Sequence, residues 1–269
     1  MRIACTTLAC PNWPLGRILS ELKAAGYDAI DFRGLGAELD VWKLPEFGAD
    51  AARTARRIAR AGLEVSAFSS SARMFAPSAE ERARHLDEVR QYARLCGIFG
   101  SRFIRVFGGP IGQTPPEQAF ETAAAALDEM ARTVGPALTV AVETHDDWIA
   151  SDLLAQVMRR VSQPNLGVLW DLHHPFRFKG ESPRQTYDNI GRWTVATHLK
   201  DSQPMADGQC RYCLPGEGDV PLAEMVRLLR QGGYDGDLTL EWEKRWHPEL
   251  EEPEVALPAY ARFMRDLAK

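Results

Sequence analysis

Eight short apolar runs, separated by segments with helical periodicity, are the feature that most restricts the fold of this chain. The runs are rich in β-branched residues, as buried strands are, and they lie at residues 2–7, 28–33, 63–69, 102–107, 138–143, 166–171, 193–198 and 237–242. Parallel strands need long crossover connections, which helices supply. Eight strand–helix units in 269 residues therefore predict one α/β domain, residues 1–269, folded as a (β/α)8 TIM barrel with parallel strands.

Two of the intervening segments carry helix-start signals. Ser78 with Glu81, and Thr114 with Glu117, match the capping box, in which a hydroxyl and a carboxylate satisfy free amides at the start of a helix. Pro115 suits the first turn of the second of these helices. We therefore expect helices to begin at both places.

Helix-stop signals and one long loop complete the pattern. Gly26 and Gly62 stand in the sequences AAGY and RAGL, each just before a predicted strand. At such a place a glycine is expected to form a left-handed C-terminal cap. Residues 201–219 form the longest segment without a strand or helix pattern, which makes them a candidate active-site loop.

Composition and charge argue against several classes of protein. The chain is 45% apolar and 26% charged, with a formal net charge of −5, whereas nucleic-acid-binding proteins usually carry a basic stripe. The first ten residues, MRIACTTLAC, do not have the pattern of a signal peptide. No apolar run reaches the roughly 18 residues of a membrane span. We therefore expect a cytoplasmic protein with neither nucleic-acid nor membrane partners.

The five cysteines are an odd number without a dense framework, so reduced thiols in a cytosol are the simpler interpretation. Cys210 and Cys213 form a CxxC pair, and Cys5 and Cys10 lie at or just after the end of the first predicted strand. One CxxC is a weak signal for zinc. Chance placement is therefore the default for these four residues.

Acidic and histidine side chains follow four consecutive predicted strands, where each strand ends. The charged and histidine residues at these four ends are Glu143, His145, Asp171, His173, His174, His198, Lys200, Asp201, Glu241, Glu243 and Lys244. Because the active site of a TIM barrel lies at the carboxyl ends of its strands, these side chains should meet at one rim. Any one of them could be a solvated loop residue, but the set of three carboxylates and one imidazole suits Mn²⁺, Mg²⁺ or Co²⁺.

The same motifs give the chain a resemblance to the xylose-isomerase-like TIM-barrel superfamily, the sugar phosphate isomerase/epimerase family. The resemblance covers nearly the whole chain and is most specific in the sequences VETH, DLHH, HLKD and LEWE. It implies that Glu143, Asp171, His198 and Glu241 hold one divalent cation, with Mn²⁺ first and Mg²⁺, Co²⁺ or Zn²⁺ as alternatives. It also implies that His174, rather than its neighbour, contacts a substrate.

The function implied by this resemblance is that of a metal-dependent isomerase or epimerase of a small sugar, sugar phosphate or polyol ketone. Glu143 and Glu241 would then be the catalytic pair, one removing a proton beside the carbonyl and the other returning a proton, through a metal-bound enediolate. The alternative is a dehydratase of the inosose or 3-dehydroshikimate type. The sequence ETH at 143–145 resembles the strand-five ending of dehydroshikimate dehydratases, which directs His145 toward the site.

Two further functions found in or beside this superfamily are disfavoured. The endonuclease IV group binds three zinc ions and needs histidines after earlier strands, but the third and fourth strands end in SAFSSS and IRVFGG. A non-catalytic barrel would be expected to have lost a ligand, and all four are present. Oligomers are common in the superfamily, so a homo-oligomer is possible.

Other side chains at the rim are candidates for binding substrate. Arg33 ends one predicted strand, and Arg105 follows Ile104 near the end of another. At these places a guanidinium could bind a carboxylate or phosphate; an ion pair between strand ends explains the two arginines equally well. Lys200, at the end of the seventh predicted strand, is another candidate. Trp13 is the last one, since aromatic faces pack against the C–H side of sugar rings. Trp148, Trp242 and Trp246 also lie near predicted rim positions.

Overall fold

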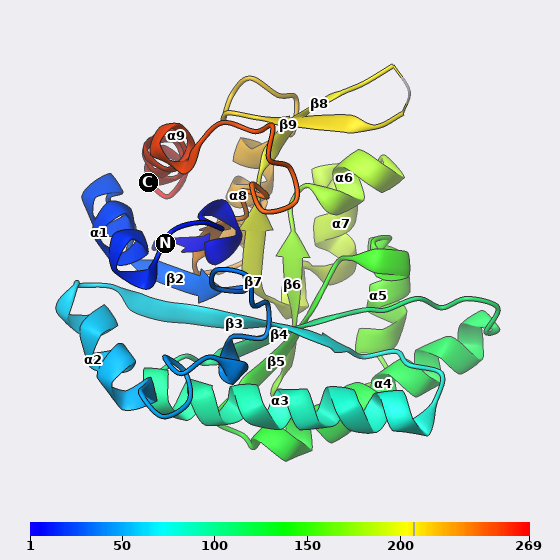
Figure 1. Ribbon diagram of the computed structural model, residues 1–269. Helices are drawn as coiled ribbons and strands as arrows, with labels where there is room; N and C mark the ends of the chain where they lie inside the picture. Colours follow the sequence, from blue (N-terminus) through cyan, green and yellow to red (C-terminus); the bar gives the residue numbers. More distant parts are fainter. Residues whose placement is uncertain (207) are drawn as a thin grey trace.

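Eight parallel strands close into the predicted TIM barrel in the computed structural model, which describes residues 1–206 and 208–269 (Figure 1). Around the barrel the order is β1-β10-β7-β6-β5-β4-β3-β2. The strands are β1 (Ile3–Thr6), β2 (Ala29–Phe32), β3 (Glu64–Arg73), β4 (Phe103–Phe107), β5 (Thr139–Glu143), β6 (Leu166–Asp171), β7 (Thr194–Leu199) and β10 (Leu238–Leu240). All eight predicted strands are confirmed, and β3 extends beyond its predicted end.

Helices connect successive strands and surround the barrel (Figure 1). In the described residues they are α1 (Leu15–Ala25), α2 (Ala51–Arg60), α3 (Ala79–Phe99), α4 (Pro116–Val134), α5 (Ser151–Met158), α6 (His174–Lys179), α7 (Pro183–Ile190), α8 (Leu222–Gln231) and α9 (Pro253–Leu267). Short 3-10 helices are η1 (Thr7–Ala9), η2 (Val41–Lys43), η3 (Asp146–Trp148) and η4 (Gly191–Trp193). The alternation of strand and helix explains why every barrel pair is parallel.

Both predicted helices are confirmed, but only one of the two predicted capping boxes forms. Ser78 caps α3, and its hydroxyl and the Glu81 carboxylate form the complete capping box. Helix α4 instead begins at Pro116, with Pro115 as a cap residue that makes no side-chain hydrogen bond. A proline disfavours the helical conformation of the residue before it, so Pro116 keeps Pro115 extended. The helix therefore starts one residue too late for Thr114 to cap it.

Glycines end two helices as predicted. Gly26 and Gly62 have φ angles of 93° and 73°, in the left-handed region that glycine adopts without steric cost. The amide of Gly26 donates back to the last turn of α1. Each glycine thereby turns the chain out of a helix and toward the next strand.

An aromatic cluster fixes the first strands against the outer helices. Phe32 of β2, Phe68 of β3, Phe99 of α3 and Phe47 have ring centroids 4.9–6.1 Å apart. Burying each such ring contributes roughly 1.5–3 kcal/mol to folding. This packed aromatic layer therefore holds β2 and β3 against α3.

Residues 201–219 are not the structureless loop that the sequence predicted. They contain an antiparallel hairpin of β8 (Asp201–Pro204) and β9 (Cys210–Cys213), seen above the barrel in Figure 1; residue 207 lies outside the described residues. The Tyr260 hydroxyl of α9 donates to the Cys213 carbonyl, and within the segment Asp201 accepts from the amides of Gly216 and Gly218. The Tyr260 contact depends on tertiary structure, so no local sequence pattern predicts it.

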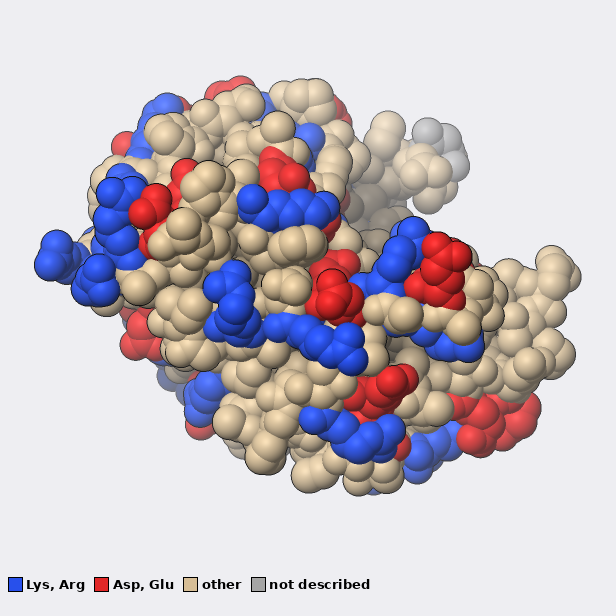
Figure 2. Space-filling model, turned by 60° about the horizontal axis from the view of Figure 1, so that its bottom comes forward, with Lys and Arg blue, Asp and Glu red and all other residues tan. Residues whose placement is uncertain are grey.

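Two observations bear on classes of partner. On the face shown in Figure 2, basic and acidic side chains are interspersed and neither sign forms a continuous stripe. Among residues 1–206 and 208–269, none of the helices combines the length and the apolar character that crossing a membrane requires.

Candidate metal centre and active site

Four side chains from four strand ends meet in the barrel mouth. Glu143 and Asp171 are the last residues of β5 and β6, His198 is the penultimate residue of β7, and Glu241 directly follows β10. Each offers one ligand atom, and these atoms all lie within 4.8 Å of one another. All four residues are at most 6% exposed. The structure therefore brings together the candidate ligands named from the sequence.

The His198 imidazole lies between three carboxylates. Its Nδ1 is 3.1 Å from Glu143 Oε1 and 3.2 Å from Glu241 Oε1, and its Nε2 is 3.0 Å from Asp31 Oδ2. Burial lowers the pKa of His198, but the carboxylates of Glu241, Asp31 and Glu143 outweigh it and hold the pKa well above its ordinary value. The carboxylates of Glu143 and Glu241 beside Nδ1 therefore stabilise positive charge at that position.

Asp31 is a part of the site that sequence reasoning missed. This residue of β2 is 1% exposed, accepts a hydrogen bond of 2.9 Å from the Ser69 hydroxyl, and faces Nε2 of His198. A carboxylate on one imidazole nitrogen fixes the ring and directs the other nitrogen toward a metal. The available signal was an aspartate inside the apolar run AIDF, where a charge needs a buried partner.

Lys200 places an ammonium group beside the same carboxylates. Its Nζ is 2.6 Å from Asp171 Oδ2, 2.5 Å from Glu241 Oε2 and 3.0 Å from Glu243 Oε1. Burial lowers the pKa of Lys200, but these three carboxylates raise it well above its ordinary value. Lys200, which was predicted to bind substrate, is thus charged and positions two candidate ligands.

Arg105 pairs with the first catalytic candidate. Its Nε is 3.2 Å from Glu143 Oε2, and its Nη1 donates to the Ser70 carbonyl at 2.9 Å. Burial raises the pKa of Glu143, but Arg105 and His198 together lower it to about 2. Glu143 is therefore ionised at neutral pH. The ion pair between strand ends that the sequence offered as an explanation of Arg105 is present, at the Nε atom of its guanidinium.

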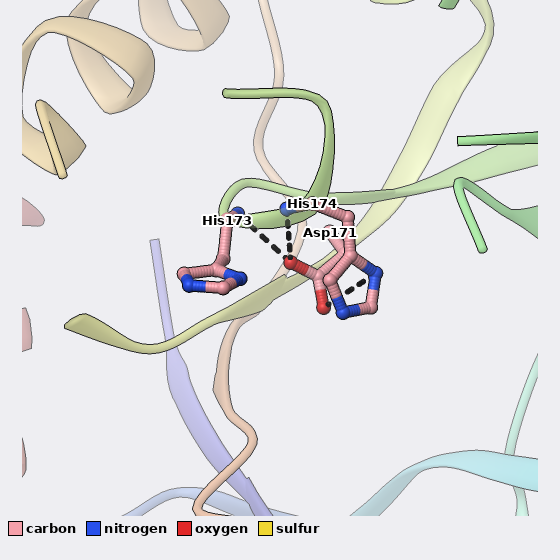
Figure 3. A group of neighbouring side chains, drawn as sticks. All are labelled: Asp171, His173 and His174. Carbon is pink, nitrogen blue, oxygen red and sulfur yellow. Dashed lines mark hydrogen bonds and ion pairs between the residues drawn. The ribbon is translucent and has the colours of Figure 1, made fainter. Parts of the chain in front are cut away.

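The two adjacent histidines have different surroundings (Figure 3). The Asp171 carboxylate accepts hydrogen bonds from the backbone amides of His173 and His174, and the two imidazole rings lie on either side of this carboxylate. His174 Nδ1 is 2.9 Å from the Thr144 carbonyl; because a carbonyl only accepts, Nδ1 carries the proton and Nε2 is left as an acceptor. His173 Nε2 instead lies 2.8 Å from the Ser202 hydroxyl, under the hairpin.

Both of these histidines are neutral at pH 7. Burial lowers the pKa of His173 well below its ordinary value, with Lys200 adding to the effect. Burial also lowers the pKa of His174, although Asp171 opposes it. With Asp171, the two histidines form a second group whose possible ligand atoms lie within 4.8 Å of one another.

His145 is the most open of the candidate imidazoles, with 38% of its side chain exposed. Its Nδ1 is 2.8 Å from Asp146 Oδ1, and its ring lies 4.6 Å from that of Phe107 and 5.1 Å from that of His174. Burial lowers the pKa of His145, but Asp146 outweighs it and raises the pKa above its ordinary value. His145 can therefore exchange a proton with a molecule in the mouth.

The cysteines do not build the zinc site that was considered for them. Cys210 and Cys213 are three residues apart in one strand, so their side chains point to opposite faces. Cys5, Cys10 and Cys213 are buried. Among the described residues, the groups that could hold a metal contain no cysteine, so the chance interpretation of the CxxC pair is the better one.

The tryptophans separate into core and cleft residues. Trp148 and Trp242 are fully buried, so they serve packing rather than contact with a ligand at the rim. Trp13 and Trp246 line a cleft of about 920 Å³ together with Leu35 and other residues of neighbouring loops. None of the four candidate metal ligands lines that cleft, so a contact of Trp13 with substrate stays a proposal.

The donor set fits a divalent cation. Three carboxylates and an imidazole are ligands of Mn²⁺, Mg²⁺ and Zn²⁺ sites. Bonds of about 2.0–2.2 Å place two ligand atoms at most roughly 4.4 Å apart, and the four atoms lie within 4.8 Å of one another. Glu143 Oε2 is also buried without a hydrogen bond in the described part of the chain. Little rearrangement would therefore be needed to bind an ion.

Comparison with known proteins identifies the family of this chain. A family model described as xylose isomerase-like TIM barrel matches residues 19–267. The fructoselysine 3-epimerase of Escherichia coli O157:H7 is 30% identical over 92 residues, which span 34% of this chain and only 32% of that epimerase.

Two solved structures show the same fold at low identity. The IolI protein with a bound zinc atom has a TM-score of 0.84 at 16% identity, covering 100% of this chain and 98% of that one. An L-ribulose 3-epimerase has a TM-score of 0.80 at 18% identity, covering 99% of this chain and 94% of that one.

Proposed function

The chain belongs to the xylose isomerase-like TIM-barrel family, and from this membership we propose that it is a divalent-metal-dependent isomerase or epimerase of a small sugar, sugar phosphate or polyol ketone. One observation carries the proposal. Two buried carboxylates, Glu143 and Glu241, approach the same imidazole nitrogen at 3.1 and 3.2 Å from two different strands. Proton transfer at the carbon beside a carbonyl needs two such groups, one to take a proton and one to return it.

Both glutamates are prepared to act as bases at neutral pH. Arg105 and His198 keep the pKa of Glu143 low in spite of burial. Burial likewise raises the pKa of Glu241, but Lys200 and His198 hold it well below its ordinary value. In the proposed reaction one glutamate, as a carboxylate, removes the proton beside the substrate carbonyl and later releases it to water. The other glutamate takes a proton from water and delivers it to the opposite face of that carbon or to the neighbouring carbon.

Other groups of the mouth orient the ligands and the substrate. A divalent cation held by Glu143, Asp171, His198 and Glu241, for which we propose Mn²⁺ first, would polarise the substrate carbonyl and the hydroxyl beside it. Lys200 and the backbone amides of His173 and His174 hold the Asp171 carboxylate in place. His174 Nε2, free of any partner among the described residues, is the acceptor we assign to a substrate hydroxyl.

A dehydratase is the second candidate, and the exposure of His145 favours it. Elimination begins with the same removal of a proton but then expels a hydroxyl from the β-carbon. That leaving group needs an acid, and the raised pKa of His145, caused by Asp146 in spite of burial, keeps more of this imidazole protonated at neutral pH. The two candidates share Glu143 and Glu241 and differ in whether His145 is required.

Exchange with solvent deuterium tests both candidates. Metal-loaded protein is incubated in D₂O with ketoses, ketose phosphates and cyclic polyol ketones, and the C–H signals are followed by NMR. We expect deuterium to enter beside a carbonyl, and the rate to fall by roughly 10³-fold in Glu241→Gln. Glu249→Gln, at a side chain that is 69% exposed, is the matched control.

The product then separates an epimer, an isomer and a dehydrated compound. Formation of a dehydrated product that is lost in His145→Ala would select the dehydratase. Equal exchange in the wild type and in Glu241→Gln would contradict the assignment of Glu241 as a proton-transferring group.

A further inference from the structure

Arg33 is a buried cation without an anionic partner among the described residues. It follows β2 directly at the barrel mouth and is 7% exposed. Among residues 1–206 and 208–269, no group forms a hydrogen bond or ion pair with its guanidinium, and its Nη1 is buried with no acceptor. A guanidinium has five N–H donors, so most of its hydrogen-bonding capacity is available.

Nearby carboxylates do not satisfy this charge because they are engaged elsewhere. Asp40 Oδ2 is 2.7 Å from Lys43 Nζ, and Glu241 Oε2 is 2.5 Å from Lys200 Nζ. Burial and the charge of Arg105 lower the pKa of Arg33 to about 10, which shows how poorly the surroundings tolerate the charge. Buried charges are normally paired, since an unpaired one costs folding free energy.

The side chain of Phe107 links Arg33 to the candidate active site. The Cζ atoms of Arg33 and Arg105 lie 5.6 and 3.8 Å from the centre of this ring, and the His145 ring centre lies 4.6 Å from it. Arg105 in turn contacts Glu143. The free guanidinium is therefore one aromatic ring away from a catalytic candidate and from the imidazole that is open to the mouth.

We propose that Arg33 binds an anionic group, a carboxylate or a phosphate, on the substrate of this site. A guanidinium forms two parallel hydrogen bonds to two oxygens of either group. The bound anion would then neutralise the charge of Arg33, which no carboxylate of the described residues does. A neutral sugar would leave Arg33 unpaired. The inference rests on the proposed function, since it names the class of substrate on which Glu143 and Glu241 act.

Matched ketoses test the subsite by equilibrium binding, independently of turnover. D-fructose, D-fructose 6-phosphate and 5-keto-D-gluconate are titrated calorimetrically into metal-loaded protein. We expect at least one charged ketose to bind about tenfold or more tightly than fructose. In Arg33→Met that preference disappears while the affinity for fructose stays the same. Arg53→Met, at a surface arginine that is 76% exposed, keeps the preference.

The two charged probes distinguish the source of the anion: a phosphate subsite favours fructose 6-phosphate, and a carboxylate subsite favours 5-keto-gluconate. The proposal is overturned if neither charged ketose binds more tightly than fructose, or if Arg33→Met keeps the preference. Binding is measured without catalysis, so the two proposals can fail separately. If the protein prefers a charged ketose but shows no deuterium exchange, the Arg33 subsite is supported and the proposed isomerase or epimerase function is contradicted.

Thermal unfolding separates this role from a structural one. Removing a buried charge that has no partner should leave Tm unchanged or raise it by about 2–4 °C, so Arg33→Met is expected to fold. A fall in Tm of several degrees would show that Arg33 stabilises the fold, and would overturn the inference that its guanidinium is reserved for a ligand.

Discussion

At the amino-terminal end of the barrel charged side chains meet in water, whereas at the carboxyl-terminal end they meet in the protein interior. Arg2, just before β1, pairs with Asp237 at 2.8 Å and with Glu64, and its side chain is 44% exposed. Arg265 pairs with Asp28 just before β2, and both side chains are about one-third exposed or more. Such pairs are screened by solvent and contribute little to stability.

The carboxyl-terminal end holds its charges under opposite conditions. Lys200, Arg105 and His198 are at most 1% exposed and lie among buried carboxylates. Taking such groups out of water usually costs more than their pairing returns. A fold alone gives no reason to keep them, so the contrast between the two ends points to the carboxyl-terminal end as the place of the chemistry.

After the roughly 10³-fold loss of exchange expected for Glu241→Gln, the next largest effect at the mouth is expected from His174. His174→Ala removes the acceptor that we assign to a substrate hydroxyl, and should lower kcat/KM by about 10²-fold with little change in Tm. His173→Ala, its matched control, removes a ring packed under the hairpin between Ser202 and Tyr212, and should lower Tm while the folded protein keeps its activity. Steady-state kinetics and thermal unfolding of the two variants check this, and the reverse pattern would show that His173 is the substrate-binding residue.

An intermediate effect is expected from Asp31, which acts through His198. Asp31→Asn keeps the shape of the side chain but removes the charge that faces Nε2, so affinity for Mn²⁺ should fall by about 10- to 100-fold. Competition with a metal chelator measures that affinity without any substrate. Ser69→Ala removes only the hydroxyl that donates to Asp31 and should cost less than tenfold. Unchanged affinity in Asp31→Asn would remove Asp31 from the site.

The smallest effect is expected at the other end of the barrel, in Arg265→Met. Burial raises the pKa of Asp28, but Arg265 and the Ile3 amide outweigh it and lower the pKa below its ordinary value. The charged form of Asp28 therefore stabilises the folded state above the unfolded pKa of about 3.9. This stabilisation is lost as the pH falls through the lower folded pKa.

Urea unfolding of the wild type and of Arg265→Met, at pH 7 and at low pH, measures the contribution. We expect a loss of about 0.5 kcal/mol at pH 7, because the pair is partly exposed, and a smaller difference at low pH or in high salt. A loss of unfolding free energy above about 2 kcal/mol would show that this exposed pair is as important to stability as a buried one, and would contradict the difference drawn between the two ends of the barrel.

The candidate site could be predicted where it depends on strand ends alone. Parallel strands in a barrel all present their carboxyl ends to one rim, so Glu143, Asp171, His198 and Glu241 had to come near one another once eight strands were identified. The pairing of Asp171 with His198 in the register of β6 and β7 is a direct result. No similar rule connects Asp31 with His198, which lie 167 residues apart.

The sequence by itself determined the strand–helix alternation, the parallel barrel and the rim that carries the ligands, because periodicity and caps are local and strand direction follows from connection length. Among the described residues, only the tertiary structure decided that Arg105 is paired with a carboxylate while Arg33 is not. It also decided that His173 lies under the hairpin and His174 in the mouth, and that Asp201–Pro204 and Cys210–Cys213 form strands. Each of these depends on which distant groups share one buried volume, and the free energy of a polar group there is set by its partners and its loss of water rather than by its neighbours along the chain.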